Sequence, residues 1–165
     1  DNDDVPAASA KLRRGMEEFA RYVCHNLRAK VPYTIDDAGN LGDFLPAAIS
    51  RYKELLGKAK AAANSWNQTE VSEELKKVDE TAKEIIGRTS VEQWYVNKAV
   101  HFNEWANFEK KDFLPVVAAY KELYQNVFSC AQKECQAVIQ ITYDGAKING
   151  VRCKCGAVNW NLTKK

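Results

Sequence analysis

With 165 residues, the chain is long enough for one domain and a small appended module, because a chain of this size buries about 70% of its unfolded surface. Its 45% hydrophobic and 28% charged residues exclude a disordered tail or a bare coiled coil. Lys and Arg number 24 against 22 Asp and Glu, and a formal net charge of +2 excludes a strong overall field for nucleic acid or anionic membranes.

The longest mostly apolar stretch, residues 113–120, contains Pro115 and is far shorter than the roughly 18 residues of a membrane helix. The first residues are acidic, unlike an export signal. We therefore expect a cytoplasmic protein with no membrane partner. Because the chain starts at Asp1, we also expect a processed product or a part of a larger protein.

The first 127 residues predict a bundle of about five helices. Apolar residues recur every three or four positions over residues 9–30, where Ser9 is a good N-cap. The second helix is expected over residues 43–66, with Asp43 as its cap and Pro46 in the first turn, where a missing N–H is tolerated.

A third helix is predicted over residues 69–86, ended by Gly87 in a C-cap position. A fourth helix is predicted to start at Ser90, which forms a Ser-x-x-Gln capping box with Gln93. The fifth is expected from Asp112 to about residue 127. The expected helical domain thus comprises residues 1–127.

The remaining residues, 128–165, change from helical to strand periodicity, and we call this segment the ribbon. Residues 138–143 and 158–162 favour strands, and Asp144-Gly145 is a strong turn pair. So short a segment has too little apolar surface to offset the conformational entropy that it loses on folding. We therefore expect a further interaction to stabilise its fold. Trp160 is expected to anchor it to its own hairpin or to the fifth helix.

Four of the five cysteines fall in the ribbon, and Cys24 stands alone as an expected buried thiol. Two pairs of thiols at opposite ends of a hairpin can converge on one tetrahedral Zn²⁺, and Gly156 allows the second turn to direct backbone N–H groups toward the sulfurs. Two disulfides, four unrelated or redox-active thiols and an Fe–S centre are the alternatives. The sequence favours a structural zinc site whose four ligands are Cys130, Cys135, Cys153 and Cys155.

Few other residues are candidates for a catalytic or ligand-binding role. Arg21 and His25 lie four apart on one helical face, which is similar in outline to the arginine–histidine pair of HEPN-like helical ribonucleases and toxins, although those usually have a five-residue spacing. His101 lies in an aromatic neighbourhood and is expected to be a packing or interface residue. The chain has no P-loop, dinucleotide-binding or nucleophile-elbow motif.

Four segments carry a resemblance to a known family. They are residues 12–19, the helix from Asp-Phe-Leu-Pro at 43–46 to Ala-Ala-Ala-Asn-Ser-Trp at 61–66, residues 96–105, and Cys-Lys-Cys-Gly at 153–156. Together they resemble the extreme C-terminal region of bacterial RecF/SMC-like (ABC-type) ATPases, which occur in DNA repair and phage defence. The resemblance implies an accessory region of a larger motor. It carries over no ATP-site residue, because the Walker and signature elements do not occur here.

We therefore expect a non-catalytic interaction module, the C-terminal part of such an ATPase, stabilised by zinc. Two other functions stay open: a ribonuclease or toxin that uses Arg21 and His25, and a stand-alone nucleic-acid-binding ribbon protein. Lys147, Arg152 and Lys154 are the expected contacts with a partner near the metal. Residues 126–165 carry six basic and two acidic residues, and four thiolates with one Zn²⁺ lower this positive charge further. Because the remaining positive charge is small for DNA binding, a protein partner is favoured.

Overall fold

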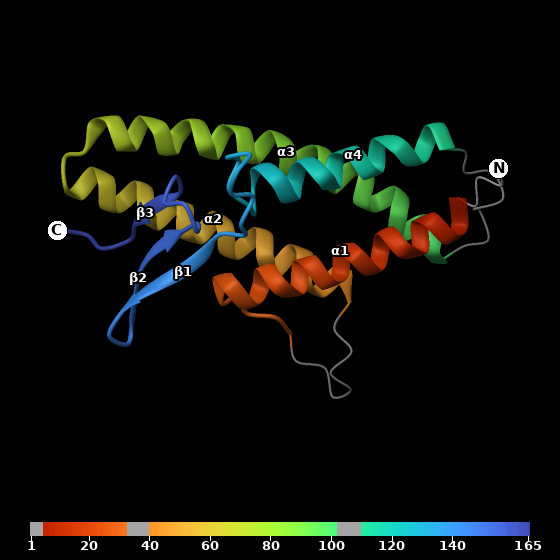
Figure 1. The fold of residues 1–165 in the computed structure, drawn as a ribbon, viewed down its shortest axis with the longest axis horizontal. Coiled ribbons are helices and arrows are strands. Elements are labelled where there is room, and N and C mark those ends of the chain that lie inside the picture. Colours follow the sequence, from red (N-terminus) through yellow and green to blue (C-terminus); the bar gives the residue numbers. More distant parts are fainter. Residues whose placement is uncertain (1–4, 33–39, 102–109) are drawn as a thin grey trace.

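The computed structural model describes residues 5–32, 40–101 and 110–165, and the side chains of residues 5, 6, 90–101 and 112 are outside this description. Within these ranges the chain is mainly helical and ends in a small antiparallel sheet (Figure 1). The helices are α1 (Val5–Leu27), α2 (Leu41–Ser65), α3 (Thr69–His101) and α4 (Lys110–Asn126). The strands are β1 (Gln140–Asp144), β2 (Lys147–Arg152) and β3 (Asn159–Asn161).

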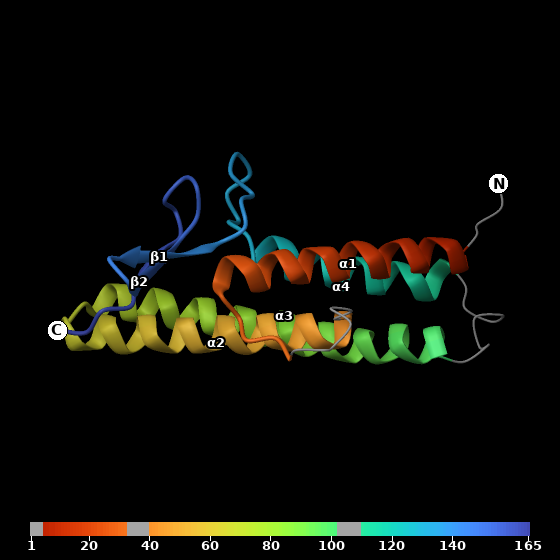
Figure 2. The ribbon, with the colours of Figure 1, turned by 90° about the horizontal axis from the view of Figure 1, so that it is seen from below.

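The helices pack in two layers, with α1 and α4 over α2 and α3 (Figure 2). Each of α1 and α3 contacts both α2 and α4, so the four helices surround one core. Because α1 covers only part of α2, the sheet lies in the layer of α1, over the remaining half of α2 (Figure 2). This position brings the ribbon onto the helices.

The prediction of five helices is wrong: the described residues form four, because the predicted third and fourth are one continuous helix, α3. Gly87 is not among the residues with positive φ, so it does not form a left-handed C-cap. Ile85 and Ile86 are buried before this glycine and Thr89 is buried after it, where its hydroxyl donates to the Ile85 carbonyl at 2.8 Å. Arg88 also pairs with Glu122 of α4 at 2.9 Å. Packing on α4 outweighs the cost of about 1 kcal/mol for a glycine in a helix.

The predicted starts of the first two helices also shift. α1 begins at Val5, so Ser9 is a buried residue inside the helix and not its cap. α2 begins at Leu41, because the Asn40 side chain accepts a hydrogen bond from the Gly42 N–H at 2.8 Å and the Asp43 carboxylate accepts one from the Asn40 N–H at 3.0 Å. Asp43 is thus the third helical residue of a capping box.

The sheet has the order β1-β2-β3, and both of its pairs are antiparallel. Ile141, Val151 and Trp160 form one cross-strand row, and the first two are buried. The next row is Thr142, Gly150 and Asn161. Because successive residues of a strand point to opposite faces, the apolar row faces the helices and the polar row faces away.

Tyr52 of α2 joins the helices to the ribbon through two aromatic contacts. Its ring lies edge-on to Phe128, with centroids 6.0 Å apart, and to Trp160, at 5.6 Å. Trp160 therefore packs on α2 and not on the last helix. Phe128, Ile139 and Val151 belong to the same buried cluster as the helical residues. The cluster is continuous from the helices into the ribbon.

Candidate metal centre

The first two ribbon cysteines lie on a loop, residues 130–137, that directly follows α4. The Cys130 N–H donates to the carbonyl of Ala137 at 2.9 Å and closes the loop. Inside it, the N–H groups of Cys135 and Gln136 donate to the Gln132 carbonyl at 2.9 and 3.0 Å. This tight turn places the Cys135 side chain back over Cys130.

The other two cysteines lie on a second loop, residues 153–158, between β2 and β3. It is closed in the same way, because the Cys153 N–H donates to the Val158 carbonyl at 3.1 Å. Gly156 has a φ of +82°, a conformation that side chains disfavour, and its N–H donates to the Cys153 carbonyl at 3.3 Å. Both loops project from the same side of the molecule (Figure 2).

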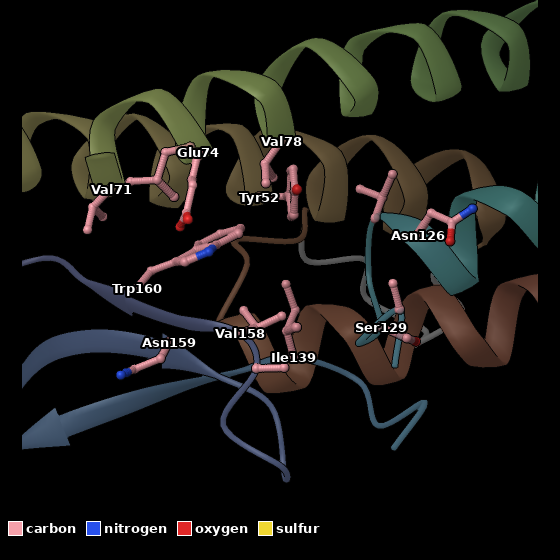
Figure 3. A pocket seen from close by; sticks show the side chains of 14 residues that line it. Tyr52, Val71, Glu74, Val78, Asn126, Ser129, Ile139, Val158, Asn159 and Trp160 are labelled. Atoms are coloured by element: carbon pink, nitrogen blue, oxygen red, sulfur yellow. The ribbon is translucent and has the colours of Figure 1, made fainter. Parts of the chain in front are cut away.

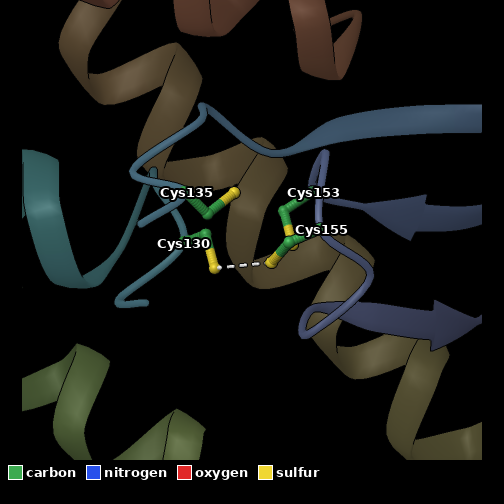
Figure 4. Close-up of side chains that lie close together, drawn as sticks. All are labelled: Cys130, Cys135, Cys153 and Cys155. Carbon is green, nitrogen blue, oxygen red and sulfur yellow. Dashed lines mark hydrogen bonds between the residues drawn. The ribbon is translucent and has the colours of Figure 1, made fainter. Parts of the chain in front are cut away.

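The two loops bring four sulfur atoms together (Figure 4). All four Sγ atoms lie within 4.8 Å of one another, and Cys155 Sγ lies 3.4 Å from that of Cys153 and 3.6 Å from that of Cys130. Sulfurs at the corners of a tetrahedron around a metal, each with a bond of about 2.3 Å, are about 3.8 Å apart. A disulfide needs about 2.05 Å, and all four cysteines are free. The donor set therefore fits one tetrahedral metal ion.

The backbone of each loop favours the ionised form of one sulfur. Burial opposes ionisation of Cys153, but the Val158 N–H donates to its Sγ at 3.2 Å and, with its neighbouring thiols, lowers its pKa to about 6. The N–H of Ala137 likewise lowers the pKa of Cys135. The Val158 donor confirms that the second turn directs a backbone N–H group toward a sulfur.

The other two sulfurs hold their protons more tightly. Burial raises the pKa of Cys130 to about 12. The pKa of Cys155 is also raised: the Ala157 N–H lowers it, but the neighbouring thiols of Cys153 and Cys135 raise it by more. Four adjacent thiolates repel one another, so all four can ionise together only when a cation lies between them.

Cys24 takes no part in this cluster. It is buried on α1, and its thiol donates to the Phe44 carbonyl at 3.2 Å. Burial raises its pKa to about 11. The prediction of a buried thiol is confirmed.

The three predicted basic contacts are exposed, but they do not lie together. Arg152 and Lys154 flank Cys153, and the Arg152 Nε donates to the Asn159 side chain at 2.9 Å. Lys147 is at the other end of β2, about 17 Å away at a rise of about 3.3 Å per residue. Of the three predicted contacts, only Arg152 and Lys154 therefore adjoin the cysteine cluster.

The predicted ribonuclease pair lies on the surface of α1. Arg21 is 3.9 Å from Glu17 and lies over the ring of Phe44, 5.0 Å from its centroid. His25 is exposed, and neither residue lines the cavity of about 280 Å³ between ribbon and helices or the cavity of about 580 Å³ beside Arg51. The side chain of His101 lies outside the described residues.

Sequence reasoning missed the residues that place the cluster. Tyr52 lies in a helical repeat of apolar residues, and such a pattern does not distinguish a contact with another helix from a contact with the ribbon. The N–H donors at Ala137 and Val158 follow their cysteines by two and five residues, and only the closed loops show where they point.

No protein-family model, curated protein or solved structure matches this chain. Across residues 5–32, 40–101 and 110–165, no helix combines the length and the apolar character that crossing a membrane requires. The candidate metal centre and the surfaces around it are therefore the basis for assigning a function.

Proposed function

We propose that the four cysteines bind one structural Zn²⁺. Tetrahedral sites made only of thiolates are typical of zinc, and thiolates also bind Fe–S clusters. The supporting observation is that two closed loops direct Cys130, Cys135, Cys153 and Cys155 to one point with sulfur separations close to a tetrahedral edge. Elemental analysis of protein purified under reducing conditions tests this: one zinc per chain supports the proposal, and no stoichiometric metal contradicts it.

The metal's role in this proposal is to fold the ribbon, not to catalyse a reaction. Four protein ligands leave no coordination position for a water or a substrate. Both loops are closed by backbone hydrogen bonds, and β2 leads directly from the sheet to Cys153. Bound metal would thus fix the two loops and the sheet between them against α2.

The function that follows is a non-catalytic module that binds another protein. Lys147 lies far from Arg152 and Lys154, and the first loop adds only Lys133, next to the acidic Glu134. Three basic side chains and one acidic side chain at the two loops are too few for a dedicated DNA clamp. The resemblance to the C-terminal region of RecF/SMC-like ATPases is consistent with such a module, and we propose that the chain is an accessory part of a larger ATPase of this kind.

A gel-shift titration at low salt tests protein docking against DNA binding. It compares wild-type protein with the double variant Arg152→Glu/Lys154→Glu, with Lys76→Glu/Lys77→Glu on α3 as a control with the same change of charge. We expect no shift of duplex DNA at low micromolar protein. A shift that the Arg152/Lys154 variant loses and the control retains would show that the ribbon binds DNA.

A further inference from the structure

A cleft lies where the ribbon meets the helices, and none of the four clustered cysteines is among the residues that line it (Figure 3). Its volume is about 280 Å³. Small-molecule sites usually have about 300–1,000 Å³, so this cleft has room for about one side chain. Its lining comes from α2, α3, the end of α4 and the ribbon: Tyr52, Val71, Glu74, Leu75, Val78, Asn126, Val127, Ser129, Ala131, Ile139, Ala157, Val158, Asn159 and Trp160.

The walls of the cleft are mostly apolar. Val78 of α3 faces Ile139 and Val158 of the ribbon across it (Figure 3). Val71, at one end, is 40% exposed. These walls suit an aliphatic side chain, because burying it removes apolar surface of both partners from water.

The cleft holds one charge. Glu74 is the only charged residue of the lining, and its carboxylate points toward the indole of Trp160 (Figure 3). Within the described residues Glu74 forms no ion pair, whereas Glu73 beside it pairs with Lys76 and Asp79 pairs with both Lys60 and Lys83. Glu74 is exposed, and its unpaired carboxylate beside a tryptophan favours a cation, through charge and through the face of the ring.

We propose that this cleft binds a basic, aliphatic segment of a partner protein. An aliphatic side chain lies against Val78, Ile139 and Val158, and a neighbouring Lys or Arg of the partner lies at Glu74. The inference rests on the proposed function, since it names the docking surface of a protein-binding module and the chemistry of its partner. Nucleic acid does not fit, because the only charge in the cleft would repel phosphate.

The cleft also depends on the metal centre. Trp160, Val158 and Ile139 belong to the ribbon, whereas Tyr52, Val71 and Glu74 belong to the helices. The two walls face each other only while the ribbon is docked on α2. Loss of the metal should therefore remove the binding site without changing any residue that lines it.

The test uses the metal-loaded full chain and two acetylated, amidated peptides, Lys-Leu-Leu-Lys and Glu-Leu-Leu-Glu. Binding is followed by the Trp160 indole N–H signal in ¹⁵N–¹H spectra, which is assigned with Trp160→Phe. We expect saturable binding of the lysine peptide and about tenfold weaker binding of the glutamate peptide, a difference typical of one charge-assisted contact. Chelation should abolish binding, and Cys24→Ser should not affect it.

Charge reversal at the cleft gives the decisive comparison. Glu74→Lys should reverse the preference between the peptides, and Glu74→Gln should remove it. Glu84→Lys is the matched control, because Glu84 is exposed on α3 and does not line the cleft. Circular dichroism and metal content establish that each variant folds.

Three results would overturn the inference: no saturable binding of the lysine peptide, an equal effect of Glu74→Lys and Glu84→Lys, or a Trp160 signal that responds to single-stranded DNA and not to peptide. These outcomes are independent of the gel-shift test. A DNA complex lost in the Arg152→Glu/Lys154→Glu variant would instead contradict the proposed function.

Discussion

Removing the metal should release the ribbon from α2 while the helices stay folded. The described helices contribute most of the buried apolar cluster, including Met16, Leu27, Leu55 and Leu123, and do not need the sulfurs to pack. The ribbon adds only a few buried apolar side chains, and in the proposed function its two cysteine loops are held by the metal. Chelation should thus act first on the contact between Tyr52 and the ribbon.

The size of the effect follows from mass action. A metal that binds only the folded chain, and is free at 100 times its dissociation constant, stabilises the folded state by about 2.7 kcal/mol. For a chain of this size, 1 kcal/mol shifts the melting temperature by about 2–4 °C. Because the buried cluster runs without a break from helices to ribbon, we expect the helical transition itself to fall by about 5–11 °C on chelation.

The assay combines three readouts on one sample: metal release by elemental analysis, helix content by far-ultraviolet circular dichroism, and tryptophan fluorescence. Trp160 lies 5.6 Å from the ring of Tyr52, so separation of the two should change its emission. Trp160→Phe identifies this signal, since the chain has four tryptophans. Cys24→Ser should respond to chelation as the wild type does, and Cys153→Ser should already resemble the chelated protein.

Two results would refute this reasoning. If stoichiometric metal leaves and neither the melting temperature nor the Trp160 emission changes, the metal does not hold the ribbon in place. If chelation instead removes most of the helical signal at 25 °C, the helices cannot form a core without the ribbon, and the metal controls the whole fold.

Three further predictions concern other parts of the chain. Asp79→Asn should destabilise the protein by about 1 kcal/mol in urea denaturation, because it breaks the 2.6 Å contact with Lys60. Since the Lys60 hydrogen bond lowers the pKa of Asp79, this contribution should be present above the carboxyl's unfolded pKa of about 3.9 and be lost as the pH falls below it; an equal difference between wild type and variant at pH 7 and pH 2.5 would contradict this. Gly150→Ala should lower the free energy of unfolding by about 1–3 kcal/mol in the same assay, because an added Cβ would lie 2.8 Å from both the Thr142 Oγ1 and the Trp160 carbonyl oxygen. A variant as stable as the wild type would contradict this, since the strands would then accommodate the Cβ without cost. Finally, calorimetry should detect no saturable, Mg²⁺-dependent binding of ATP, since the sequence has no P-loop.

The sequence by itself determined the composition of the metal centre. Four cysteines in two pairs, separated by a strand pattern with strong turn residues, predict two ligand pairs at opposite ends of a hairpin that converge on one metal ion, and the structure brings Cys130, Cys135, Cys153 and Cys155 together. The mainly helical class followed equally from periodicity, because apolar residues spaced by three and four positions can form one buried stripe only on a helix. Both inferences depend on local spacing along the chain.

Only the tertiary structure decided where helices end and which surfaces meet. Gly87 is a good local stop signal, but burial of Ile85, Ile86 and Thr89 against α4 continues α3 through it. The docking of Trp160 on Tyr52 joins residues more than one hundred positions apart, and no local pattern encodes such a pairing. The cleft at Glu74 depends on that docking, because its two walls come from the helices and from the ribbon.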